Sequence, residues 1–138
     1  MNHYLNKLQN NKTKHVYGFM MDINDFKAIN DTYGHLKGDY ALIQFGIILQ
    51  HSIDKDSVAI RMGGDEFVIF AILKSNEEAL ALKKHIEQNV RQFNIHSKEP
   101  FHLSFSIGIA KYSGNIDTFL SAMDDSMYEA KNMHRLMH

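Results

Sequence analysis

Residues 61–67, Arg-Met-Gly-Gly-Asp-Glu-Phe, leave the backbone few ways to fold. Their two adjacent glycines lie between the apolar runs 58–60 and 68–70. Adjacent glycines accept the positive φ angles of a type I′ or II′ turn, and β-branched and aromatic flanks are typical of strands. We therefore predict a hairpin with strands 57–62 and 66–73 and with Asp65 and Glu66 exposed at its tip. Such acids suit a cation or a substrate, and they are also common as solvated surface groups.

A second acidic group ends the first predicted strand. Residues 16–21 are an apolar run of strand length, which indicates a strand buried on both faces, and Asp22 follows before a helical pattern over 25–33. Open sheets usually bind ligands at the carboxyl ends of their strands. If this strand and the hairpin are neighbours, Asp22 and Asp65 converge into a site that suits Mg²⁺. Helix capping is the alternative role, and it fits Asp25 better than Asp22.

The remaining pattern predicts an α+β fold. Helical spacing indicates helices over 38–53, about 77–93 and about 116–134, and a further apolar run indicates a strand over 101–111. In the helix 38–53 we expect five residues on the inner side: Leu42, Ile43, Phe45, Gly46 and Leu49. The order β-α-β-β-α-β, with extra helices, is that of a ferredoxin-like unit with a central, mainly antiparallel sheet.

Composition narrows the classes of function. A length of 138 residues with 44% hydrophobic content fits one small domain. The formal net charge of -1 argues against a nucleic-acid-binding surface, and the absence of cysteine excludes disulfide and thiolate chemistry. No apolar run approaches membrane-spanning length and no leader pattern is present, so we expect no membrane contact by this fragment.

Four separated motifs together resemble a known family. They are residues 22–35 (Asp-Ile-Asn-Asp-Phe-Lys-Ala-Ile-Asn-Asp-Thr-Tyr-Gly-His) with Gly38-Asp39, the hairpin motif 63–67, the run 104–110, and the helix 124–135 with Tyr-Glu-Ala-Lys at 128–131. In this order and register, from about Asn2 to Arg135, they resemble the GGDEF domain of diguanylate cyclases. The resemblance implies the palm fold of nucleotidyl cyclases and a single GGDEF domain over residues 1–138.

The resemblance also implies roles at the acidic site. Mg²⁺ or Mn²⁺ would be bound by Asp22, Asp65 and the backbone carbonyl of Ile23. Asp65 would also take the proton of the attacking hydroxyl, and Glu66 would be a further metal ligand or would orient one. Lys27 matches a lysine that stabilises charge during transfer, although a solvated helix lysine is an equal alternative.

Guanine recognition calls for an amide and a carboxylate, because the base offers N1–H and N2–H donors beside acceptors. By resemblance, Asn30 and Asp39 read this edge, and His35 lies close to the base pocket. Each residue also has a structural alternative. Asn30 would end a short helix, Asp39 would cap the next helix, and His35 would make a hydrogen bond at the turn.

Lys131 and Arg135 are four residues apart, so they share one face of the closing helix. By resemblance they clamp the terminal phosphates of a nucleoside triphosphate, although basic residues also complement the carboxyl end of any helix. The chain has no Gly-x-x-x-x-Gly-Lys-Ser/Thr loop, which excludes P-loop binding. We expect further phosphate contacts from backbone amides around 24–26.

The chain departs from the family pattern in three places. The opening Asp-x-Leu-Thr-Gly-Leu-x-Asn-Arg stretch is not present, so relative to the family we expect an amino-terminally truncated domain, either an excised fragment or a naturally short one. The closing Gly-Arg-Asn is His134-Arg135-Leu136. The inhibitory Arg-x-x-Asp site corresponds to Asp-Lys-Asp-Ser at 54–57, so we expect no product inhibition there.

The resemblance implies a diguanylate cyclase that condenses two GTP molecules into cyclic di-GMP and pyrophosphate across a homodimer of domains. The alternative is a catalytically silent, GTP-binding regulatory domain. An unrelated palm module acting on nucleic acid is disfavoured by the charge balance. The family further implies a regulatory or sensory partner domain and a cytoplasmic location in bacteria, either free or as part of a membrane-bound signalling protein.

Overall fold

The computed structural model describes residues 14–137, which form one four-stranded sheet and four helices. The predicted amino-terminal truncation relative to the family concerns residues outside this range. The strands are β1 (His15–Ile23), β2 (Val58–Gly63), β3 (Glu66–Leu73) and β4 (Phe105–Lys111). The helices are α2 (Phe26–Tyr33), α3 (His35–Ser52), α4 (Asn76–His96) and α5 (Ile116–Met137).

The sheet has the strand order β2-β3-β1-β4, and every neighbouring pair is antiparallel. This order, with its β-α-β-β-α-β connectivity and the additional helices, confirms the predicted ferredoxin-like α+β class. Because β1 is a central strand, both of its edges are hydrogen-bonded, and the carboxyl end of β1 lies beside the β2–β3 hairpin.

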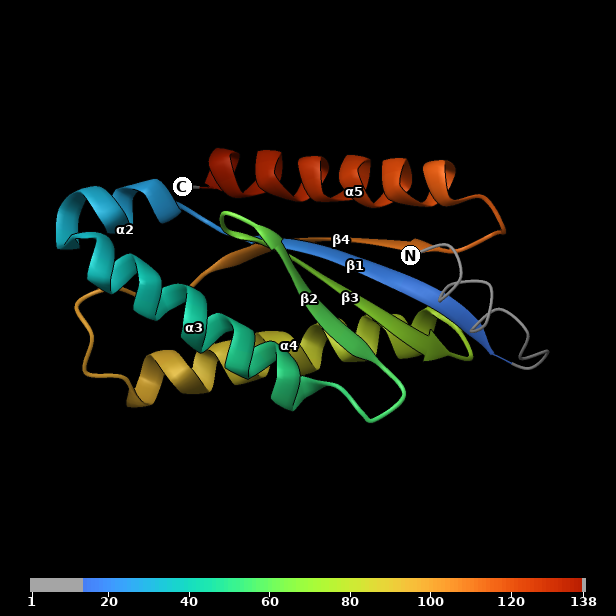
Figure 1. Ribbon diagram of the computed structural model, residues 1–138, viewed down its shortest axis with the longest axis horizontal. Helices are drawn as coiled ribbons and strands as arrows, with labels where there is room; N and C mark the ends of the chain where they lie inside the picture. Colours follow the sequence, from blue (N-terminus) through green and yellow to red (C-terminus); the bar gives the residue numbers. More distant parts are fainter. Residues whose placement is uncertain (1–13, 138) are drawn as a thin grey trace.

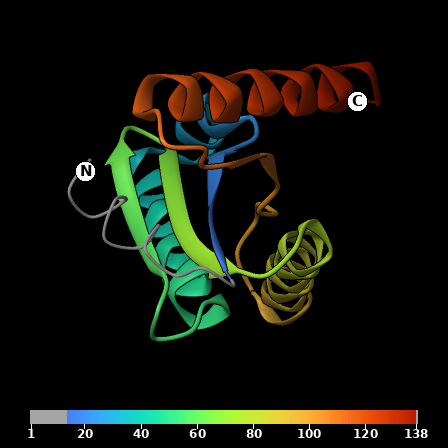
Figure 2. The same cartoon turned by 90° about the vertical axis from the view of Figure 1, so that its right-hand side faces the viewer.

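The sheet lies between two helical layers. Helices α3 and α4 cover one face, and α5 runs along the other face (Figures 1 and 2). Short helix α2 follows β1 and lies near the carboxyl end of α5 (Figure 1). The end of β1, the start of α2 and the last turns of α5 are therefore brought together at one edge of the molecule.

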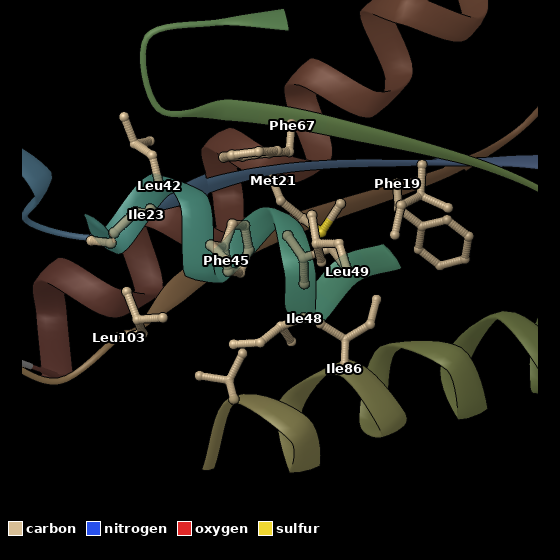
Figure 3. Close-up of a cluster of buried hydrophobic side chains, with 14 of the residues drawn as sticks. Phe19, Met21, Ile23, Leu42, Phe45, Ile48, Leu49, Phe67, Ile86 and Leu103 are labelled. Atoms are coloured by element: carbon tan, nitrogen blue, oxygen red, sulfur yellow. The ribbon is translucent and has the colours of Figure 1, made fainter. Parts of the chain in front are cut away.

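The period of two along β1 divides its side chains between the layers. Phe19, Met21 and Ile23 point into the larger core, where they pack with α3 and α4 side chains such as Phe45 (Figure 3). Val16 belongs to the smaller cluster under α5, with Phe119, Met123 and three further residues, Val68, Phe70 and Tyr112. By the same alternation Asp22 faces α5. The run 16–21 is thus buried on both sides, as predicted.

Two glycines allow α5 to lie close to the sheet. A Cβ atom at Gly108 would overlap the backbone nitrogen of Met127 and the backbone oxygen of Met123. At Gly18 the overlap would be with side chains, because a Cβ there would meet the Met123 sulfur and lie 2.6 Å from Phe119 Cζ. The backbone contact at Gly108 fixes the distance between α5 and β4. The contact is at Met127, which lies one helical turn before Lys131.

Three sequence expectations about the elements are corrected. Strand β4 begins at Phe105 rather than at residue 101, because the Asn94 side chain donates to Leu103 O and accepts from Leu103 N, at 2.8 Å each. Helix α3 begins at His35 rather than at residue 38, directly after Gly34 with φ 92°. Ile43 was expected on the inner side of α3, yet it is 60% exposed.

Candidate functional site

Asp22 is a buried carboxylate in an apolar strand. Its side chain is 6% exposed and forms an ion pair with the Lys131 ammonium through Oδ2. Its other oxygen, Oδ1, is buried and has no hydrogen-bond partner. Burial raises the pKa of Asp22 above its ordinary value; the hydrogen bond and charge of Lys131 oppose this increase, and the nearby Asp65 charge adds to it. A buried oxygen left without a partner is costly, which marks Asp22 as a site for a ligand.

The β2–β3 hairpin brings Asp65 to the same place. Gly64 has φ 55° and is the first of two loop residues, whereas Asp65 is not among the residues with positive φ, which excludes a type I′ turn. The backbone amide of Ile23 donates to Asp65 O at 3.4 Å, so the loop lies against the end of β1. Asp22 and Asp65 therefore lie close together, as predicted.

Arg61 stabilises this loop. Its guanidinium donates through Nε and Nη2 to the backbone oxygen of Gly64, at 3.0 and 2.8 Å. Two donors from one planar group fix the position of the carbonyl, and therefore the position of the Asp65 backbone that follows it. Arg61 was not identified as a site residue from the sequence, although it opens the hairpin motif.

A cavity of about 230 Å³ lies above these acids. Its lining comes from β1, the β1–α2 turn, the hairpin loop and α5, and comprises Asp22, Ile23, Asn24, Asp25, Phe26, Lys27, Asp65, Lys131, His134 and Arg135. Three basic side chains thus face a cluster of carboxylates. Lys131 and Arg135 come from α5, and Lys27 comes from α2. This mixture of charges suits an anion bound together with a cation.

The β1–α2 turn is held rigidly beside the cavity. Asn24 donates its amide to Ser104 Oγ at 2.9 Å and accepts from Ser106 Oγ at 2.7 Å, which ties the turn to β4. Asp25 precedes α2 with φ 58° and makes no side-chain capping bond. The predicted capping role of Asp25 is therefore wrong, and its side chain leaves the first amides of α2 uncapped.

Asn30 and Asp39 are brought together across α2 and α3. A Cβ atom at Gly38 would overlap Asn30 Oδ1, so the amide lies directly against the backbone that carries Asp39. Asp39 is within α3 and does not cap it, because the helix begins at His35. Asp39 also lines a second cavity of about 490 Å³ with five other residues, Leu42, Ile43, Gly46, Arg61 and Phe67.

Two other predicted site residues, Glu66 and His35, line neither of the two cavities. Glu66 is the register partner of Asp22 and is exposed, so the two acids project from the same face of neighbouring strands. His35 is the exposed first residue of α3 and is not among the residues that line either cavity. The catalytic, substrate and metal roles assigned to these residues from the sequence remain predictions.

The acidic groups fit a divalent cation that is shared with a ligand. Among residues 14–137 no group of three or more His, Cys, Asp or Glu side chains is close enough to hold a metal by itself. Asp22 nevertheless presents a buried oxygen without a partner, beside Asp65 and the Ile23 backbone. Mg²⁺ typically takes one or two carboxylates from the protein and completes its shell with waters and substrate phosphates, and Asp22 and Asp65 are two such carboxylates in this cavity.

His134 also lines the cavity and was not identified as a site residue from the sequence. Its Nε2 atom lies 3.3 Å from Asp25 Oδ2. The signal available in the sequence was its spacing of three residues from Lys131, which places both on one face of α5. Over the described part of the chain, no helix has the length and hydropathy required to span a bilayer.

Comparison with known proteins finds a family model and relatives that match most of the chain. The family model described as "Diguanylate cyclase, GGDEF domain" matches residues 1–136. Diguanylate cyclase DgcM of Escherichia coli K12 is 36% identical over 115 residues, which are 82% of this chain and 28% of DgcM. Response regulator PleD of Caulobacter vibrioides is 33% identical over 122 residues, which are 84% of this chain and 27% of PleD. The chain thus spans less than a third of the length of these curated relatives.

The fold is also shared with solved structures. The crystal structure of the GGDEF domain of YfiN (TpbB) from Pseudomonas aeruginosa superposes with a TM-score of 0.86 at 26% sequence identity. The match covers 96% of this chain and 87% of that one. The family model, over residues 1–136, includes all the elements that build the cavity.

Proposed function

Because the chain belongs to the GGDEF domain family of diguanylate cyclases, we propose that it condenses two GTP molecules into cyclic di-GMP with release of two pyrophosphates. The observation that carries this proposal is the buried Asp22 carboxylate, which has an oxygen without a partner in a cavity shared with Asp65, Lys131 and Arg135. A buried acid of this kind costs stability, and a shared cation with a triphosphate offsets that cost.

The reaction forms two phosphodiester bonds. In each, a 3′-hydroxyl oxygen of one GTP attacks the α-phosphorus of the other, the bond to the β-phosphate oxygen breaks, and pyrophosphate leaves with its electron pair. The hydroxyl proton passes to a carboxylate; Asp65 at the rigid hairpin loop is the base we assign, and Glu66 flanks it. Mg²⁺ or Mn²⁺ held by Asp22, Asp65 and the Ile23 carbonyl would neutralise charge on the phosphates during transfer.

The triphosphate is bound by groups from two helices. Lys131 and Arg135 project from one face of α5, and Lys27 projects from the first turn of α2. The uncapped amides of that first turn lie at the positive end of the helix dipole and add donors for phosphate oxygens. When the triphosphate binds, Lys131 exchanges its contact with Asp22 for a phosphate, which leaves Asp22 available to the cation.

Guanine recognition is assigned to Asn30 and Asp39. The Asp39 carboxylate accepts hydrogen bonds from N1–H and N2–H of the base, and the Asn30 amide pairs with the remaining polar atoms of the base. Their juxtaposition across Gly38 supports this assignment, because the two side chains must reach one planar base together. His35, at the start of α3, is assigned to the rim of this pocket.

The activity requires two copies of the chain. One cavity holds one GTP, so each hydroxyl must reach the α-phosphate of a GTP held by a second copy. The chain spans under a third of the length of DgcM and of PleD, and we infer that regulatory or sensory domains outside this span bring the copies together in the cytoplasm. PleD, which is named a response regulator, is a relative in keeping with such control.

The test is product formation from GTP and Mg²⁺. The chain is dimerised through a parallel coiled coil fused to its amino end, and cyclic di-GMP and pyrophosphate are measured together. We expect product from the wild type and from the exposed control variant Asp124→Asn, and none from Asp65→Ala. GTP binding without product would instead assign a regulatory GTP-binding role, and no GTP binding would refute both functions.

A further inference from the structure

Helix α5 brings an additional side chain to the cavity, at a position where the family pattern has glycine. His134 follows Lys131 by three residues and precedes Arg135, so it lies on the same face of the helix. Its Nε2 atom is 3.3 Å from Asp25 Oδ2, and the side chains of His134 and Asp25 are 20% and 75% exposed. The contact joins two segments that are 109 residues apart in the sequence.

Asp25 occupies the position where an aspartate usually caps a helix. A capping aspartate adopts extended backbone angles and accepts hydrogen bonds from the amides of the second or third helical residue, here Lys27 or Ala28. Asp25 instead has φ 58° and ψ 30°, in the left-handed region, and makes no side-chain capping bond. Its carboxylate is directed toward His134, and the first amides of α2 remain available at the cavity.

We infer that His134 is a positioning residue for the triphosphate, because it holds the Asp25 carboxylate away from the amino end of α2. This inference rests on the proposed function, since it concerns the phosphates of the same GTP. Without His134, Asp25 moves from its left-handed angles to the extended angles of a capping residue, and its carboxylate then covers the amides that the phosphates require. The capping bond must be broken before the triphosphate binds, and the carboxylate repels the ligand.

A purely structural role for His134 is a weaker explanation. The carboxyl half of α5 is held by other contacts, because Lys131 pairs with Asp22 and Met123 and Met127 are buried against the sheet. The His134–Asp25 pair is at the exposed mouth of the cavity, where such pairs add little to stability. Its position among the phosphate-binding groups therefore points to the ligand rather than to the fold.

The experiment measures binding of the non-reactive α,β-methylene analogue of GTP with Mg²⁺ by calorimetry. The variants are His134→Ala, Asp25→Gly and the double variant. Glycine is chosen at position 25 because it accepts the left-handed backbone. The matched control is His96→Ala, at the exposed end of α4, where Nε2 lies 3.2 Å from Gln92 Oε1. Guanosine, which has no phosphates, is titrated in parallel by NMR chemical shifts.

We expect His134→Ala to weaken binding of the analogue roughly fivefold. This factor corresponds to the loss of about 1 kcal/mol, the free energy of an aspartate cap. Guanosine affinity should not change, and the double variant should bind the analogue as tightly as Asp25→Gly alone. Amide exchange at Lys27 and Ala28 should slow in His134→Ala, because a cap now protects them.

Three results would overturn the inference. They are an unchanged affinity of His134→Ala for the analogue, an equal loss of affinity for guanosine, and a loss of analogue affinity in the double variant relative to Asp25→Gly. Failure of the proposed function looks different, because the wild type and the His96→Ala control would then also fail to bind the analogue, and this inference would fall with it.

Discussion

Replacing Gly108 with alanine should impair the site from a distance. The new Cβ would lie 2.8 Å from Met127 Cα and would overlap the backbone of Met123 and Met127. Carbon atoms in contact are about 3.5–4.0 Å apart, so α5 must move about 1 Å away from β4. Backbone atoms cannot rotate out of the way, and the helix must therefore move as a unit.

The expected magnitudes follow from that displacement. Overpacking of this kind costs about 1–3 kcal/mol of the free energy of unfolding, which urea denaturation measures. Lys131 lies one turn beyond Met127, so it moves with the helix away from Asp22 and the cavity. A misplacement of about 1 Å can reduce turnover on the order of 100-fold. We expect both losses in Gly108→Ala, with cyclic di-GMP formation as the assay of turnover.

Gly18→Ala is the matched control at the same interface. Its Cβ would meet the Met123 sulfur and the Phe119 ring edge, which are the ends of side chains nearer the start of α5. These groups can shift without moving Lys131, so we expect a loss of stability of about 1–3 kcal/mol with turnover within about threefold of wild type. Equal turnover in the two variants, or wild-type stability and turnover of Gly108→Ala, would show that α5 does not move away from β4 as expected.

Three further predictions concern single features. Because burial raises the pKa of Asp22, the stability that this group contributes is full below its ordinary pKa of about 3.9 and is lost as pH rises through the raised value. Asp22→Asn should therefore gain stability relative to wild type as pH rises, as seen by thermal denaturation; a gain that grows on acidification would contradict this. Arg61→Ala should lower the free energy of unfolding by at most about 1 kcal/mol but should lose turnover, because it removes the two-donor contact to Gly64. Arg61→Lys should restore little of that turnover, because an ammonium cannot replace this contact. Calorimetry should detect no tight binding of cyclic di-GMP at residues 54–57, where the Asp54 carboxylate accepts from Asp56 N and Ser57 Oγ; a tight site there would disprove the expectation.

Local patterns predicted the elements that form the acidic site. The paired glycines fixed the hairpin, and the apolar run before Asp22 identified a buried strand, because both depend on backbone and side-chain preferences within a few residues. The family resemblance then indicated Lys131 and Arg135 as partners from the far end of the chain. The cavity brings all of these residues together.

Contacts between distant segments could not be predicted in the same way. The start of β4 at Phe105 depends on the Asn94 side chain, which satisfies the backbone of Leu103 in place of a strand. Asp25 was expected to cap α2, but His134 contacts its carboxylate from the other end of the sequence. Propensities describe a residue and its neighbours, so they miss a contact made by a side chain 109 residues away.

We propose that Asp22 and Asp65 together hold a divalent cation beside the nucleotide. Electron paramagnetic resonance of Mn²⁺, titrated with the chain and the α,β-methylene GTP analogue, measures this directly. We predict protein-bound Mn²⁺ in the wild type, loss of most of it in Asp22→Asn and in Asp65→Asn, and little further loss in the double variant. Wild-type binding of Mn²⁺ in either single variant would contradict the claim.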